Sequence, residues 1–216
     1  MILIDCIKCY FKVLDRIWLL LMAFWIPVDV LVVLFEPLTT VVGISWVFLC
    51  PAVAFATYEA MKGESHGFGY YLGKCGTYFG MTFVFGLVFG LIVLGLSFLL
   101  IIPGILGFAY LQFMNDAGYN LGLTECGAAL KKSYRLVKGN LWTTVFFQFV
   151  IFCVCTVVFL IPCFFIDLDE NGAGSFLALL FIQVWFDLVY LFWQVCGRVW
   201  FLRLVRIDLA RARNGE

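Results

Sequence analysis

Long runs of apolar residues, separated by short polar stretches, organise the whole chain. A bilayer core of about 30 Å requires about 20 apolar residues in helical form, and six segments reach that length or come close to it. Their approximate limits are 17–35, 39–60, 78–102, 105–122, 141–164 and 176–202. The run "VFGLVFGLIVLGLSFLLII" is apolar on every face, whereas strands of a membrane barrel alternate apolar and polar positions. The pattern predicts an all-α, polytopic membrane protein with six transmembrane helices in one domain, 1–216.

Composition supports a membrane protein and narrows the chemistry. Hydrophobic residues make up 64% of the chain and charged residues 13%, against about 45–50% and about 25% in soluble domains. The net charge is zero, which gives no overall attraction to nucleic acid. Cys6 and Cys9 form a CxxC pair without a second pair or matching histidines, so we expect no metal and no cofactor. Lipidation of these two cysteines stays open.

The basic residues predict how the chain is oriented. With six spans, all 14 Lys and Arg residues fall on one side of the membrane, and the acidic turn with Asp167, Asp169 and Glu170 falls on the other. This is the positive-inside pattern. It predicts a multi-pass protein of a bacterial-type plasma membrane with both termini in the cytoplasm.

A short basic segment lies between the fourth and fifth spans. Over about 124–139, the apolar residues Cys126, Leu130, Tyr134 and Val137 recur at helical spacing on one face, and Lys131, Lys132, Arg135 and Lys138 gather on the other. Thr124 is the expected N-cap. The segment is too short and too polar to span, which predicts an amphipathic helix on the cytoplasmic surface. Its cations would contact anionic lipid headgroups or a protein partner; the alternative is a basic loop that only sets topology.

The connection between the second and third spans, with Lys62 and Lys74, has a similar layout. Each of the two units runs from a span through an amphipathic connection into a second span, and the units close on "IIP" at 101–103 and "LIP" at 160–162. The parallel suggests an internal repeat, which is common in membrane folds.

Four features of residues 102–142 follow a family pattern. They are an Ile-Pro-Gly turn at 102–104, an acidic residue at Asp116, Ala-Leu-x-x-Ser at 129–133 and Lys-Gly-x-x-Trp at 138–142. The segment resembles the membrane-anchor domain of bacterial glycerophosphodiester phosphodiesterases and its small uncharacterised six-helix relatives. "CPAVAFATYEAMKGES" is similar, more weakly, to YesL-type membrane proteins. The resemblance implies a membrane fold and no hydrolase, because the phosphodiesterase activity belongs to a separate barrel domain for which this chain has no room.

Polar side chains follow one stripe of the sixth span. Gln183, Asp187, Tyr190 and Gln194, with Arg198 beyond them, lie at spacings of three or four residues, which places them on one helix face. The polar residues expected to face them are Gln112, Asn115 and Gln148. Buried charge in a span is a candidate functional site. The stripe predicts either a hydrated cavity around Asp187, for a lipid headgroup or a proton, or a protonated Asp187 that only fixes helix register.

Two further features are expected to be structural. Asp29 follows Pro27 in the first span, where a polar side chain helps hydrate a proline kink. Gly86 and Gly90 form a GxxxG motif in the third span, which predicts close helix packing within the chain or with a partner.

Enzyme motifs are lacking in the sequence. "GFGYYLG" is not a dinucleotide fingerprint, and His66 has no nucleophile at a recognisable spacing. The leading hypothesis is therefore a non-enzymatic membrane protein that acts as an accessory, scaffold or regulatory subunit. The alternative is a small transporter or lipid-handling protein that uses a polar cavity around Asp187.

Overall fold

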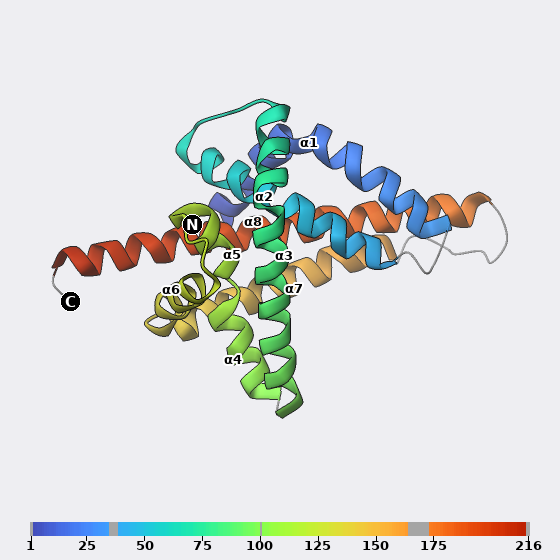
Figure 1. Ribbon diagram of the computed structural model, residues 1–216. Coiled ribbons are helices and arrows are strands. Elements are labelled where there is room, and N and C mark those ends of the chain that lie inside the picture. Colours follow the sequence, from blue (N-terminus) through green and yellow to red (C-terminus); the bar gives the residue numbers. More distant parts are fainter. Residues whose placement is uncertain (1, 35–38, 100, 164–172, 215–216) are drawn as a thin grey trace.

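The computed structural model describes residues 2–34, 39–99, 101–163 and 173–214, and every regular element in them is a helix (Figure 1). The predicted all-α class is confirmed. The acidic turn with Asp167, Asp169 and Glu170 lies outside the described residues. The helices are α1 (Ile2–Leu34), α2 (Thr39–Lys62), α3 (Phe68–Leu99), α4 (Ile101–Leu111), α5 (Met114–Leu121), α6 (Cys126–Lys138), α7 (Leu141–Cys163) and α8 (Ala173–Asn214).

Four helices are long and apolar enough to cross a membrane. They are Ile2–Leu34, Phe68–Phe98, Leu141–Pro162 and Ala178–Arg213, and they overlap the first, third, fifth and sixth predicted spans. Large apolar side chains are exposed on them, including Leu91, Phe98 and Phe146. Such a surface suits lipid and is unusual on a soluble protein. The structure thus supports a membrane protein, while the prediction of six transmembrane helices is not confirmed.

The single helix predicted over 105–122 is wrong. Helix α4 ends at Leu111, a two-residue turn follows, and α5 begins at Met114. Eleven residues of α4 rise only about 16 Å, roughly half the apolar thickness of a bilayer. The physical reason lies in α5, which buries Met114, Ala117 and Tyr119 in the protein and carries Asp116 toward a cation on α8.

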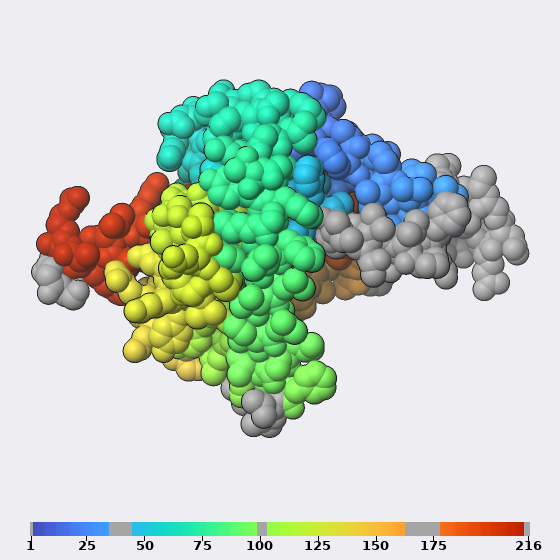
Figure 2. Space-filling model, viewed as in Figure 1, coloured from blue at the N-terminus to red at the C-terminus, as the bar shows by residue number. Residues whose placement is uncertain are grey.

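The long helices do not all run in one direction. In Figure 1, α1, α2, α7 and α8 extend along the length of the molecule, and α3 crosses them. Helix α4 packs back against α3, and Figure 2 shows this hairpin standing out from the body. Helix α3 contacts α2, α4 contacts α7, and α5 contacts α6. The candidate site described below lies where α3 crosses the long helices.

Helix α2 occupies the centre of the molecule. It contacts α1, α3, α5 and α8, and its stretch of Ala52, Val53, Ala54 and Ala56 is fully buried. Small side chains allow neighbouring helix backbones to approach closely in membrane proteins. The sequence of α2 therefore suits a position surrounded by other helices.

Glycines pack the α3–α4 hairpin, but they are not the two that the sequence suggests. A Cβ atom at Gly86 or Gly90 would meet no described atom within 4 Å, so close packing by this GxxxG motif is not made inside the described chain. A Cβ at Gly104 would lie 3.1 Å from the backbone Cα of Ser97, and one at Gly107 would meet Leu96. The tight contact of the hairpin is therefore made by α4.

We predict that Gly104→Ala destabilises the protein by about 1–2 kcal/mol, because overpacking against a backbone atom outweighs the gain in helix propensity. Gly90→Ala is the matched control, since its Cβ enters open space; it should be neutral or slightly stabilising. The measurement is the free energy of unfolding in detergent micelles. Equal effects of the two substitutions would contradict the packing described for Gly104.

The predicted amphipathic helix exists as α6, with a different buried face. Its N-cap is Glu125, not Thr124, and it buries Ala129, Ser133, Leu136 and Val137. The Ser133 hydroxyl donates a hydrogen bond of 2.6 Å to the Tyr110 carbonyl of α4. Contact with α4 and α5 thus sets the rotation of the helix, and the apolar face of α6 is turned toward protein.

The four basic residues of α6 do not form one free patch. Lys132 Nζ lies 2.8 Å and Arg135 Nη2 3.1 Å from Asp208 Oδ2 on α8. Lys138 lies over the ring of Tyr134, and Lys131 is exposed. Two of the cations predicted to bind lipid or a partner therefore hold α6 against the C-terminal part of α8.

In a double-mutant cycle, Lys132→Ala and Asp208→Ala should show a coupling energy of about 0.5–1 kcal/mol in unfolding free energy, because the pair is partly shielded from water. The same cycle with Lys131→Ala, on the exposed side of α6, should give no coupling. Raising the salt concentration should weaken the first coupling. A coupling that is equal in the two cycles would contradict the specific ion pair.

Candidate functional site

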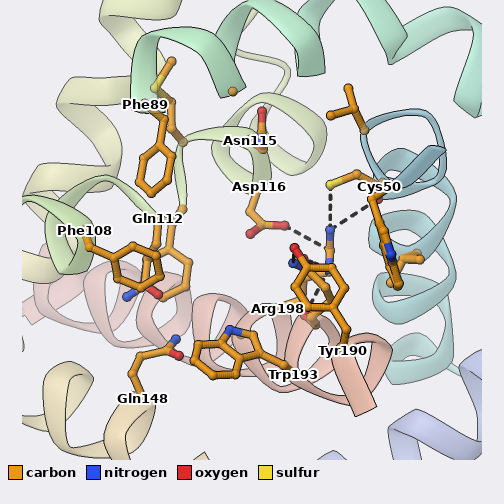
Figure 3. Close-up of a pocket in the computed structure, with 18 of the residues that line it drawn as sticks. Cys50, Phe89, Phe108, Gln112, Asn115, Asp116, Gln148, Tyr190, Trp193 and Arg198 are labelled. Atoms are coloured by element: carbon orange, nitrogen blue, oxygen red, sulfur yellow. Dashed lines mark hydrogen bonds and ion pairs between the residues drawn. The ribbon is translucent and has the colours of Figure 1, made fainter. Parts of the chain in front are cut away.

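A cavity of about 690 Å³ lies where α3 crosses the long helices. Residues of α2, α3, α4, α5, α7 and α8 line it. Its volume falls within the range of about 300–1,000 Å³ that is usual for small-molecule sites. Several of the lining side chains are shown in Figure 3. The cavity thus depends on the tertiary arrangement and is not contained in any one segment.

Aromatic side chains form a large part of the cavity wall. They come from five of the surrounding helices, and apolar and aromatic walls are typical of ligand sites. The aromatic residues that line the cavity outside the α4–α5 turn are Trp46, Phe85, Phe89, Phe108, Phe152, Phe159, Phe186, Tyr190 and Trp193. Such a wall suits the apolar body of a ligand.

The cavity also collects the polar residues that the sequence placed opposite one another. Gln112 of the α4–α5 turn, Asn115 of α5 and Gln148 of α7 line it together with Tyr190 and Gln194 of α8. The Oδ1 atom of Asn115 is buried and has no hydrogen-bond partner in the described residues. An unpaired buried acceptor usually has an unseen partner such as water or a ligand. These residues therefore offer amide groups to the polar part of a bound molecule.

An ion pair that sequence reasoning missed lies beside these amides. Arg198 Nε of α8 is 3.4 Å from Asp116 Oδ1 of α5, and the two residues are only 2% and 7% exposed. The Tyr58 hydroxyl donates a 2.7 Å hydrogen bond to the same carboxylate oxygen. Buried charges are tolerated when they are paired and hydrogen-bonded. The two charges in the cavity wall therefore neutralise each other.

Further hydrogen bonds hold the Arg198 side chain in place. Its Nη1 donates to the Gln194 carbonyl and to Gln194 Oε1, at 3.0 and 2.9 Å. Its Nη2 donates to the Cys50 carbonyl of α2 at 3.3 Å and lies 3.0 Å from Cys50 Sγ (Figure 3). The Gln194 amide also donates to the Tyr190 hydroxyl at 2.8 Å. Arg198 thus connects α2, α5 and α8 through these contacts, and its side chain has little freedom to move toward a ligand.

Other predicted residues lie away from the cavity. Asp187 is 1% exposed and is not among the residues that line the cavity; its Oδ1 accepts a 3.0 Å hydrogen bond from Trp46 Nε1, on the α2 side. Gln183 is half-buried one turn earlier on α8. Gly86 lines the cavity and Gly90 does not. The structure therefore divides the predicted stripe between the cavity and a contact with α1 and α2.

Asp29 and the CxxC pair are buried. Helix α1 continues through Pro27, and Asp29 is 1% exposed within the bundle. Cys6 and Cys9 lie in the core with exposures of 0% and 5%. Neither thiol is presented at the surface for lipidation.

No protein-family model, curated protein or solved structure matches the chain in comparisons with known proteins. The resemblance to the phosphodiesterase membrane anchors stays a prediction. The cavity is therefore the feature that bears on the function of the protein.

Proposed function

We propose that the protein is a non-enzymatic integral membrane protein that binds an uncharged amphipathic molecule in the cavity between α3 and the long helices. The observation that carries this proposal is the cavity of about 690 Å³, whose lining combines aromatic rings with amide groups. Of the two hypotheses from sequence, it favours the lipid-handling protein, because a subunit that works only through helix packing needs no such space.

The chemistry of the wall favours a neutral ligand. The apolar body would lie against rings such as Phe89, Phe108 and Phe152, and the head would meet Gln112, Asn115 and Gln148. The one cation that lines the cavity, among the described residues, is Arg198, and it is already paired with Asp116. An anionic head would find no free positive charge there and would lose its hydration on entry. Hydroxyl or amide heads can instead exchange hydrogen bonds with the amides.

Photolabelling can test the proposal. The protein, reconstituted in nanodiscs, is exposed to a photoactivatable monoacylglycerol and, separately, to a fatty acid with the same reactive chain. We expect the neutral probe to label peptides that carry Phe108, Phe152 and Trp193, and the anionic probe to label them much less. Labelling only of exposed residues such as Phe98 and Phe146 would contradict the proposal and favour the scaffold hypothesis.

We further propose that both termini and α6 face the cytoplasm of a bacterial-type cell. In support, the C-terminal end of α8, the N-terminal part of α1 and α6 lie toward the same end of the molecule in Figure 1. The proposal requires that the chain from the start of α3 to α6 begins and ends on the same side of the membrane. Reporter fusions after Glu216 and at Asn171 should read cytoplasmic and external, respectively.

A further inference from the structure

Two carboxyl groups meet in the interior of the helix bundle. Asp29 of α1 and Asp187 of α8 are each 1% exposed, and their side chains interact electrostatically. The Trp46 indole links them, because it donates to Asp187 and its ring lies 4.6 Å from that of Trp25, one helical turn before Asp29. Helices α1 and α8 pack together along this contact. The pair lies outside the residues that line the cavity, so the proposed function does not use it.

The hydrogen bonds around the pair are incomplete. Trp46 Nε1 donates to Asp187 Oδ1 at 3.0 Å. Asp187 Oδ2, both oxygens of Asp29 and the Trp25 Nε1 donor, one turn before Asp29, have no donor or acceptor from the described protein groups. A hydrogen bond between two carboxyl groups requires a proton. A proton bound between the two side chains would therefore supply the hydrogen bond that joins them.

Within the described part of the chain, no cation acts on either carboxyl group of the pair. The sequence contains no Lys or Arg between Ile17 and Met61 or between Leu141 and Gly197. Tyr190 faces the same side, edge-on to the Trp46 ring at 4.4 Å, and Arg198 is about three helical turns beyond Asp187 and bound to Asp116. Adjacent buried carboxylates cannot both carry charge at low cost, so charge on the pair must be removed by protonation.

The pair and the cavity share one side chain. The Trp46 indole donates to Asp187 and also lines the cavity, with its ring 4.6 Å from that of Trp25 and 4.4 Å from that of Tyr190. A change of charge on Asp187 alters the strength of the indole hydrogen bond, and an indole that shifts also moves a wall of the cavity.

We propose that Asp29 and Asp187 form an intramembrane proton-binding site, and that its proton occupancy is coupled through Trp46 to ligand occupancy of the cavity. In the protonated state one proton is shared between the two carboxyl groups and holds α1 against α8. On release the proton passes to water and leaves two carboxylates that repel each other. The proton site stands independently, whereas the coupling rests on the proposed function.

Infrared difference spectroscopy of the full chain in nanodiscs, without added ligand, tests the proton site. We expect a protonated-carboxyl band that disappears as the pH is raised. The band should be lost in the Asp29→Asn/Asp187→Asn double variant and retained in Asp15→Asn, which removes an exposed carboxyl from the same helix. A band that persists in the double variant, or the lack of any titrating band in the unmodified protein, would overturn the proton site.

Trp46→Phe provides a test that keeps both carboxyl groups, in case the double variant does not fold. Without the indole donor the carboxylate is less stabilised, so the midpoint of the band should move up by about one pH unit. An unchanged midpoint would show that the titrating group is not beside Trp46 and would overturn the assignment.

Labelling by the photoactivatable monoacylglycerol across the same pH range tests the coupling. We expect cavity labelling to change through the midpoint of the infrared band in the unmodified protein and to be independent of pH in the double variant. Labelling that does not follow the band overturns the coupling and leaves the proton site standing. A titrating band without any cavity labelling overturns the proposed function, and the coupling with it, and leaves the proton site standing.

Discussion

Replacing Arg198 by methionine is expected to lower the free energy of unfolding by about 3–5 kcal/mol, which is the usual cost of removing one partner from a buried ion pair. The substitution leaves the Asp116 carboxylate buried with Tyr58 as its remaining donor, and it removes the hydrogen bonds from Arg198 to Cys50 and Gln194. The contacts through which Arg198 connects α2, α5 and α8 would then be lost. Denaturant titration in mixed micelles, followed by tryptophan fluorescence, gives the free energy.

Two variants separate the ion pair from the loss of an arginine as such. Arg206→Met removes an exposed cation from the same helix and should change stability by no more than about 0.5 kcal/mol. Adding Asp116→Asn to Arg198→Met should recover part of the loss, because no charge then remains buried without a partner. If Arg198→Met is as mild as the control, the Arg198–Asp116 contact does not stabilise the protein.

Helix positions could be predicted where the signal is local. Long apolar runs identify α1, α3, α7 and α8, since helical hydrogen bonding is the way for a single segment to satisfy its backbone in lipid. The prediction over 105–122 was wrong because hydropathy averages over a window and cannot see a tertiary partner. Asp116 and Arg198 are distant in the sequence, and their pairing places the break before α5.

The sequence identified several residues of the candidate site. It could not show which residues of the α8 stripe line the cavity and which contact α1 and α2. Helical periodicity places Tyr190 and Gln194 on one face of α8, and both line the cavity with Gln112 and Gln148. The same periodicity includes Asp187, yet its neighbours decide its role: Trp46 and Asp29 lie on the side of α2 and α1. The role of Asp187 depends on which helices pack against α8, and the periodicity of a single segment does not give its packing partners.

The amphipathic helix α6 is a second case in which packing partners could not be predicted from the pattern of one segment. Charge spacing predicted a helix close to the observed α6 (Cys126–Lys138). The buried face is rotated because Ser133 binds the Tyr110 carbonyl and Asp208 binds Lys132. The spacing of apolar and charged residues predicts that the segment is a helix. Its contacts with neighbouring helices determine which face of that helix is buried.

A leucine at Gly86 is expected to reduce cavity labelling by the neutral photoprobe about tenfold, which corresponds to about 1.4 kcal/mol of binding free energy. Gly86 lines the cavity, and a Cβ atom there would meet no described atom within 4 Å. The new side chain would therefore begin in open space and occupy volume that the ligand needs. Labelled peptides, quantified by mass spectrometry at several probe concentrations, give the change in affinity.

Gly90→Leu makes the comparison specific, because Gly90 lies one turn further along α3, is exposed and does not line the cavity. Both substitutions replace a helical glycine by leucine and should raise the intrinsic stability of α3 similarly, by up to about 1 kcal/mol. A loss of labelling confined to Gly86→Leu can therefore be attributed to occupied volume. An equal loss in both variants would place the probe on the outer surface of α3, and unchanged labelling in both would remove the cavity as the binding site.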